Sequence, residues 1–317
     1  MESGKPLTTG ETYAEFAARE ARGVSPVYER LASAVARDEG FLGLLAGLPA
    51  AKRQPNLFFG VVRLLGGPVA DPAAFRDFAT AHWPKIEAEM RVRITQTNEA
   101  GRCAVLLPLL AALPQPLALL EVGASAGLCL YPDRYSYRYG DHAVGTGEPV
   151  LTCAAHGLVP PAERPRVVWR ADLDLNPLNV TDPADVAWLD ALIWPEHDHR
   201  RARLGAAAAI AAADPPLLVP GDLGDDLPAL AAQAPADATL VVFHTSVLHL
   251  VPAPRRTAFT ATVTGLPGHW IANESLGVLP YDPLPPPPTG GSVHVLALDG
   301  RPTAWTRPHG QEITWIS

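Results

Sequence analysis

Apolar positions recur at helical spacing throughout the first third of the chain. Two helix starts carry an N-cap residue followed by proline, at Ser25-Pro26 and Asp71-Pro72, and Trp83-Pro84 interrupts the second helix. A last helix is predicted from about Asn98 to Leu113, before a proline-rich stop. The pattern therefore predicts an all-helical cap, without strands, over residues 1–115.

From Leu117 onward, short apolar runs alternate with helical stretches, which is typical of a parallel α/β sheet. The predicted strands are residues 117–122, 167–171, 217–220, 239–243 and 269–272, with residues 293–298 and 312–316 as a closing pair. An insertion near 133–165 is expected to contain a hairpin between residues 135–139 and 150–153. We predict one α/β domain over residues 116–317, with a mostly parallel sheet and a closing antiparallel strand.

Composition narrows the class of protein. The chain has 317 residues and is 48% hydrophobic, and its net charge of −8 argues against non-specific nucleic-acid binding. Three scattered cysteines and a polar start without a signal peptide predict a cytoplasmic protein. Prolines and Glu121 interrupt the one uncharged stretch, residues 103–120, so no membrane segment is expected.

The string LLEVGASAGL, residues 119–128, fits two chemistries. Gly123, Ser125 and Gly127 spell the G-x-S-x-G motif of an α/β-hydrolase nucleophile elbow. Such an elbow follows several earlier strands and an oxyanion loop, whereas here only helices precede it. The hydrolase is therefore the weaker reading. The other reading is the first strand and glycine loop of a nucleotide-binding fold.

Glu121 points to the kind of nucleotide. A carboxylate at this strand tip would repel a pyrophosphate, whereas S-adenosylmethionine carries a sulfonium and an ammonium and has no phosphate. Gly123 and Gly127 would let the backbone approach this ligand, and Ser125 would be a small loop residue. The structural alternative is a tight strand-to-helix turn that Glu121 caps.

Other predicted strand ends offer further candidates. Asp174, preferred over Asp172, would hold ribose hydroxyls, and Asp222 would meet the adenine amino group, although both also fit turn or capping roles. His244 would contact the ligand and is a candidate base, with Glu274 as the second candidate.

A polar segment, RITQTNEAGRC, precedes the first predicted strand. We expect Asn98 and one of Arg93 or Arg102 to face the cleft, with the arginine on a carboxylate of cofactor or substrate. Asn98 also fits a helix N-cap. His197-Asp198-His199 has no matching cluster, so no metal site is predicted.

The strings TQTNEAGRC, LLEVGASAGL, DLDLNPLNVTD and VVFHTSVLHL resemble an uncharacterised bacterial family, domain of unknown function 2332. The second half is similar to class I S-adenosylmethionine-dependent methyltransferases. This resemblance implies a Rossmann-like methyltransferase fold in which Glu121, Gly123, Gly127, Asp174 and the His244 region bind the cofactor. Ser125 replaces the usual middle glycine, and the acid follows the loop at an unusually long distance.

The sequence thus predicts an S-adenosylmethionine-dependent methyltransferase that acts on a small molecule. A non-catalytic binding or scaffold protein with the same fold is the main alternative. A hydrolase that uses Ser125 and an NAD-binding oxidoreductase are further alternatives.

Overall fold

The computed structural model describes residues 7–316, which form two compact units. The helical unit comprises the chain up to Thr97 together with Asp182–Ala202, and the sheet unit comprises Asn98–Thr181 and the chain from Arg203. Residues 1–6, which carry most of the polar start, lie outside the described residues. Among the described residues, no helix has both the length and the apolar character needed to cross a membrane.

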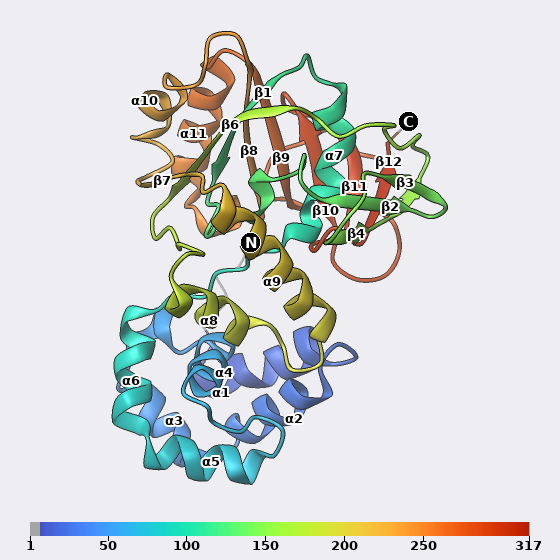
Figure 1. Ribbon diagram of the computed structural model, residues 1–317. Helices are drawn as coiled ribbons and strands as arrows, with labels where there is room; N and C mark the ends of the chain where they lie inside the picture. Colours follow the sequence, from blue (N-terminus) through green and yellow to red (C-terminus); the bar gives the residue numbers. More distant parts are fainter. Residues whose placement is uncertain (1–6, 317) are drawn as a thin grey trace. The chain divides into compact units, whose positions relative to one another are not determined.

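The helical unit contains no strand among its described residues, as predicted. Ser25 caps one helix by accepting a hydrogen bond from the Tyr28 amide at 3.0 Å, and Asp71 caps another in the same way. Its elements (Figure 1) are α1 (Thr9–Glu15), the π-helix η1 (Phe16–Ala21), α2 (Pro26–Val35), α3 (Glu39–Ala46), η2 (Ala50–Lys52), α4 (Pro55–Leu64), α5 (Pro72–Ala81), α6 (Trp83–Val92), α8 (Pro183–Leu192) and the start of α9 (Asp198–Ala213).

The unit boundary differs from the predicted boundary after residue 115 in two respects. Segment 182–202 belongs to the helical unit because α8 packs closely on α4: a Cβ on Gly60 would lie 3.0 Å from Leu192. Conversely, α7 (Cys103–Ala112) belongs to the sheet unit, where the hydroxyl of Tyr139 donates to the Ala104 carbonyl at 2.5 Å.

The sheet unit is a mixed α/β structure. Besides α7 it contains the helices α10 (Leu227–Ala231) and α11 (Ala253–Gly265), and the 3-10 turns η3 (Ala100–Arg102), η4 (Leu128–Leu130) and η5 (Leu248–Leu250). Its strands are β1 (Leu117–Val122), β2 (Ser136–Tyr139), β3 (His142–Val144), β4 (Val150–Thr152), β5 (Ala154–His156), β6 (Val167–Asp174), β7 (Leu217–Pro220), β8 (Thr239–Thr245), β9 (His269–Ser275), β10 (His294–Leu298), β11 (Arg301–Thr306) and β12 (Glu312–Trp315).

The large sheet has the strand order β5-β12-β11-β10-β9-β8-β1-β6-β7. Strands β7, β6, β1, β8 and β9 are parallel, and β10 to β12 continue as an antiparallel meander. The chain runs outward from β1 to β6 and β7, and then returns to the other side of β1 with β8. Strands β1 and β8 therefore flank the point where the strand order reverses, the usual ligand-binding position in such sheets.

Two predicted pairings are wrong. The late strands β10 and β12 do not pair with each other, because each pairs with β11, a strand that the sequence analysis missed. In the insertion, β4 does pair with β2, but in parallel. The hairpin is formed instead by β2 and β3, within a second, three-stranded sheet.

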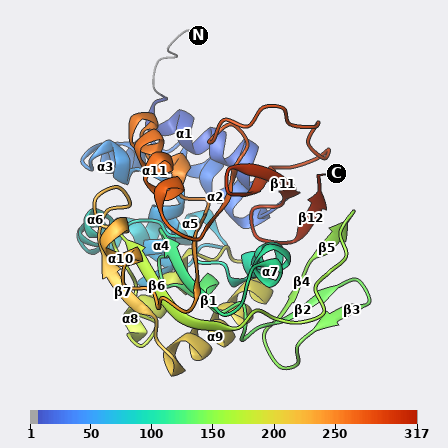
Figure 2. The ribbon, with the colours of Figure 1, turned by 90° about the horizontal axis from the view of Figure 1, so that it is seen from above.

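Side chains alternate between the two faces of the large sheet. Leu120 and Val122 of β1 pack with Leu227 of α10 and Phe259 of α11, so these helices cover one face. Glu121, between the two, points to the opposite face. In Figures 1 and 2, α7 lies on the side of the sheet away from α10 and α11. The face beneath α10 and α11 is called the α11 face below, and the other is called the α7 face.

Candidate functional site

The loop after β1, residues 123–127, is held by side chains from two other segments. Gly123, Ser125 and Gly127 all have positive φ, of 69°, 60° and 66°. Asp174, at the end of β6, accepts the Ser125 amide on Oδ2 at 2.8 Å. Asn98 accepts the Leu128 amide at 3.1 Å and donates to the Ala124 carbonyl. The predicted candidates Asn98 and Asp174 therefore both shape this loop.

The two glycines have packing reasons of their own. A Cβ on Gly123 would lie 2.6 Å from the Val247 side chain, which comes from the segment after β8. A Cβ on Gly127 would lie 3.0 Å from Leu130 and would require a positive φ. Glycine is required at both positions by the protein itself, and Val247 fills the space directly over Gly123.

A pair of buried carboxyls lies beside this loop on the α7 face. Glu121 of β1 and Asp172 of β6 are register partners on neighbouring parallel strands, and both are less than 5% exposed. Oε2 of Glu121 and both carboxyl oxygens of Asp172 lack a hydrogen-bond partner among the described residues. The hydroxyl of Ser125 is likewise buried without a partner. Buried polar atoms without a partner cost stability, so a group of them in one place is a candidate binding site.

The electrostatics of this pair disfavour ionisation. Burial raises the pKa of Asp172 to about 8, the charge of Asp174 adds to the rise, and the Ala124 amide opposes it without forming a well-aligned hydrogen bond. Burial also raises the pKa of Glu121 well above its usual value, and Cys129 and Asp172 reinforce the rise.

Arg102, in η3, is a buried cation on the same side of the sheet. Its Nη1 donates to the Thr245 carbonyl and hydroxyl at 3.0 and 3.1 Å, and its Nε donates to the Pro308 carbonyl at 2.9 Å. Among the described residues, no carboxylate forms an ion pair with Arg102, although its charge lowers the pKa of Glu121 in part. Arg102 thus joins η3 to the tip of β8 and keeps its charge uncompensated.

His244 and Glu274 form a second buried pair, on the α11 face. Nδ1 of His244 lies 2.7 Å from Oε1 of Glu274, and Nε2 of His244 accepts the indole N–H of Trp270 at 3.0 Å. His244 is therefore a neutral imidazole with its proton on Nδ1, and both of its nitrogens are engaged. Neither nitrogen can accept a substrate proton without breaking a buried hydrogen bond.

Glu274 fixes the segment that follows β8. Its Oε1 also accepts the amides of Val247 and Leu248 at 2.8 and 3.1 Å. Burial acts to raise the pKa of Glu274, but these hydrogen bonds and the one from His244 outweigh it and hold the pKa below its usual value. Oε2 of Glu274 is buried and lacks a partner among the described residues, as does the nearby hydroxyl of Tyr281.

A serine–histidine cluster lies at the tips of β8 to β10. His294 is 3.4 Å from the Ser246 hydroxyl through Nδ1 and 3.0 Å from the Ser275 hydroxyl through Nε2. Burial and Arg102 lower the pKa of His294 to about 4, so it is neutral near pH 7. Ser246 has a positive φ of 58°, but the following amide, that of Val247, donates to Glu274 and offers no oxyanion hole.

The remaining candidates have structural partners. Asp222 accepts the Gly224 amide at 2.7 Å within a turn and pairs with Arg255, and it does not cap α10, whose N-cap is Asp226. Arg93 belongs to the helical unit, where it pairs with Glu89 at 2.6 Å and stacks over Trp188. No group of three or more His, Cys, Asp or Glu residues in the described part of the chain could hold a metal ion.

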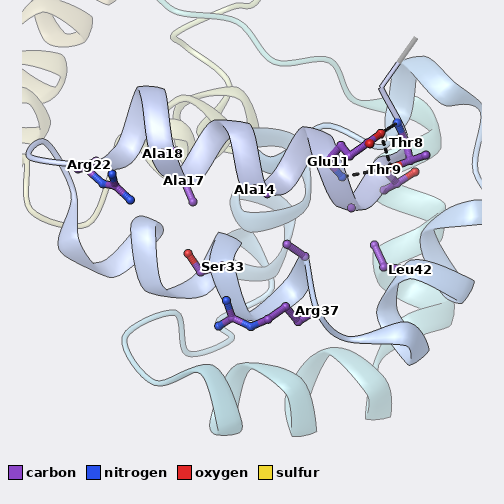
Figure 3. Close-up of a pocket in the computed structure, with 12 residues that line it drawn as sticks. Thr8, Thr9, Glu11, Ala14, Ala17, Ala18, Arg22, Ser33, Arg37 and Leu42 are labelled. Atoms are coloured by element: carbon purple, nitrogen blue, oxygen red, sulfur yellow. Dashed lines mark hydrogen bonds between the residues drawn. The ribbon is translucent and has the colours of Figure 1, made fainter. Parts of the chain in front are cut away.

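A separate hollow of about 650 Å³ lies in the helical unit (Figure 3). Small side chains of α1, η1 and α2 form much of its wall. Its polar lining consists of Thr8, Thr9, Glu11, Arg22, Ser33 and Arg37. Arg22 pairs with Glu29 at 3.1 Å, and Thr8 caps α1 together with Glu11. The hydroxyl–carboxylate contact in this lining, from Thr8 to Glu11 at 2.8 Å, belongs to the cap of α1, so we do not assign this hollow as an active site.

The structure brings most of the predicted residues together within the sheet unit, at the carboxyl ends of the parallel strands. Asp172 was considered but Asp174 was preferred to it, and His294 was missed as a site residue. The alternation of V-V-W-R-A-D-L-D already placed Asp172 and Asp174 on one face, but the register that sets Asp172 beside Glu121 joins segments fifty residues apart.

The molecule is thus a mixed α/β protein with a helical unit and a candidate ligand site at the carboxyl edge of its sheet. The chain belongs to the bacterial family described as "Uncharacterized protein conserved in bacteria (DUF2332)", whose model matches residues 10–315. No curated protein and no solved structure matches the chain.

Proposed function

We propose that this protein is an S-adenosylmethionine-dependent methyltransferase that acts on a small molecule. The observation that carries the proposal is the buried, unpartnered carboxyl pair Glu121–Asp172 beside a glycine loop. The pair adjoins β1 at the point where the strand order reverses. A site whose carboxyl oxygens have no cation paired with them suits a cationic nucleoside better than a pyrophosphate.

The strand order supports a nucleotide-binding fold. Numbered in chain order, the five parallel strands lie in the order 3-2-1-4-5, which matches five of the six strands of a Rossmann sheet, and an antiparallel strand follows the fifth. Two features depart from the common pattern. The glycine loop leads into the short 3-10 turn η4 rather than a helix, and the chain ends in a three-stranded meander.

The residues at this edge match the polar ends of the cofactor. Glu121 would attract the sulfonium or ammonium, and Arg102, which lacks a carboxylate partner, would bind the methionine carboxylate. Asp174 would accept ribose hydroxyls, since each of its oxygens keeps a lone pair beyond its bond to Ser125 or Asn176. When bound, the cofactor would supply a sulfonium methyl group, which a nucleophile attacks as the thioether sulfur leaves.

The protein's own contribution would be alignment. His244 is a positioning residue, because its two nitrogens hold Glu274 and Trp270. Glu274 fixes the β8 tip with Oε1, and its Oε2 is buried on the face of the sheet opposite the carboxyl pair. The lowered pKa of Glu274 makes it a weak base, so orientation outweighs proton transfer here.

Two observations favour the non-catalytic alternative. Both His244 nitrogens are already hydrogen-bonded, and the Val247 side chain lies over Gly123. These contacts would suit a protein that binds a nucleoside without transferring a group.

Calorimetric titration separates these functions. We expect S-adenosylmethionine and its demethylated product to bind the purified protein, and NAD not to bind. Methyl transfer from labelled cofactor to small molecules of a cell extract then distinguishes the enzyme from the binding protein. Failure of both methionine derivatives to bind would contradict the cofactor assignment, and binding of NAD would favour an oxidoreductase.

A further inference from the structure

The position of the Glu121–Asp172 pair limits how far its two carboxyl groups can ionise. The two side chains leave register-matched positions of adjacent parallel strands toward the same face, so their carboxyl groups are neighbours. Both are buried, and three of their oxygens lack a hydrogen-bond donor among the described residues. Two carboxylates buried on neighbouring strands do not both ionise readily unless donors or a cation offset the repulsion.

The surroundings of the pair provide little compensation. Asp174 and Cys129 both disfavour ionisation of Glu121, and Arg102 is the cation that opposes them. The hydrogen bonds of Arg102 go to Thr245 and Pro308 rather than to the pair. The titratable and charged groups that face the pair are Arg102 from η3, Cys129 from η4, Asp174 from β6 and Tyr135 from the segment before β2.

We infer that Glu121 and Asp172 hold a shared proton in the ligand-free protein and exchange it for the positive charge of the bound ligand. In this exchange, the carboxyl O–H bond breaks, the proton passes to solvent or buffer, and the two carboxylates then face the sulfonium or ammonium. Charge balances, because one cation enters as one proton leaves. The inference rests on the proposed function for the identity of the cation.

The exchange makes affinity depend on pH. If binding releases one proton, the affinity for the cationic ligand rises about tenfold per pH unit. This dependence holds over the pH range in which the ligand-free pair is still protonated. The raised pKa of Asp172, about 8, places this range around neutrality. Adenosine has no sulfonium and no ammonium, so its affinity should stay constant over the same range.

Infrared spectroscopy tests the shared proton without any ligand. At pH 7, the wild-type protein should show the carbonyl band of a protonated carboxyl. The band should be missing in the double variant Glu121→Gln/Asp172→Asn and retained in Glu274→Gln, which alters the carboxyl on the α11 face. A spectrum that is identical in wild type and double variant would overturn the shared proton, whatever the protein binds.

Calorimetry in two buffers of different ionisation enthalpy tests the exchange. We expect S-adenosylmethionine to release about one proton near pH 7 and adenosine to release none. Binding of S-adenosylmethionine without proton release would overturn the exchange and leave the proposed function intact. The carboxyl band without binding of either methionine derivative would overturn the proposed function, and with it the exchange, but not the shared proton.

Discussion

Two buried glutamates of one sheet have opposite environments. Glu121 lies on the α7 face with an unpartnered oxygen, beside a second carboxyl. Glu274 lies on the α11 face, and its Oε1 accepts three hydrogen bonds, from His244, Val247 and Leu248. Both are less than 5% exposed, yet the pKa of Glu121 is raised and the pKa of Glu274 is lowered. Donors, and not burial, decide which buried carboxyl is ionised.

The difference separates a structural role from a ligand-binding role. The donors around Glu274 use its charge to hold the chain after β8 in place. The carboxyls at Glu121 and Asp172 have no such use within the protein, and an unsatisfied polar pair costs stability. The comparison therefore assigns the α7 face to ligand binding and the Oε1 side of Glu274 to support of the β8 tip.

The largest expected effect comes from the same substitution on the two faces. Glu274→Leu leaves the His244 N–H and two buried amides without an acceptor and should lower the free energy of unfolding by about 3–5 kcal/mol. Glu121→Leu removes an unpartnered carboxyl of similar size and should be neutral or stabilising. Urea denaturation followed by circular dichroism measures both. Equal losses of unfolding free energy in the two variants would contradict the distinction between the two faces.

The pH dependence of stability should be the next largest effect. Asp172 has a raised pKa in the folded state, so its contribution is fully present below pH 4 and is lost as pH rises to about 8. Glu274 has a lowered pKa, so its contribution is lost only in acid. Between pH 6 and 8, the free energy of unfolding of the wild type should fall by about 2 kcal/mol because of Asp172. This decline should be absent in Asp172→Asn and retained in Glu274→Gln. Thermal melts across this range would contradict the account if the wild type and Asp172→Asn decline in parallel.

Arg102 offers a test with a smaller effect. Arg102→Ala should lower the affinity for S-adenosylmethionine by about tenfold, because a charge-assisted hydrogen bond to the carboxylate of the cofactor is lost. Arg301→Ala, which removes an exposed cation of β11, is the control and should leave affinity unchanged. An unchanged affinity in Arg102→Ala, together with a large drop in melting temperature, would show that Arg102 only joins η3 to β8.

The smallest effect is expected at Ser125. Its hydroxyl lacks a partner, and its positive φ of 60° suits glycine better than serine. Ser125→Gly should retain cofactor binding with stability unchanged or slightly raised, and a fluorophosphonate probe should leave the wild-type protein unlabelled. Stoichiometric labelling of Ser125 would support the hydrolase alternative.

Local patterns predicted much of the fold. The runs at β1 and β7 were located to the residue, and β6, β8 and β9 extend two or three residues beyond the prediction. Strand β11 was missed because R-P-T-A-W-T begins with an arginine and a proline, which mask its apolar positions. Segment 182–202 lies in the helical unit rather than in the predicted α/β domain, since its packing against α4 depends on a glycine, Gly60, that is distant in sequence.

The candidate site was harder to predict from the sequence than the fold. The polar run before β1 and the acid of the glycine loop were visible, and the structure places Asn98, Arg102 and Glu121 in one unit. The pairing of Glu121 with Asp172 depends on register, and the engagement of His244 depends on Trp270 of a neighbouring strand. Such contacts between distant segments leave no local signal in the sequence.

The most direct test of the central claim compares two ligands on two variants by calorimetry. Glu121→Gln should weaken S-adenosylmethionine by about ten- to a hundredfold and leave adenosine unchanged, because adenosine lacks the cationic end. Asp174→Asn should lower the affinity for both ligands. Asp299→Asn, at the opposite edge of the sheet, should lower the affinity for neither. Equal losses of adenosine in Glu121→Gln and Asp174→Asn, or full S-adenosylmethionine affinity in Glu121→Gln, would contradict the assignment of Glu121 to a cationic ligand.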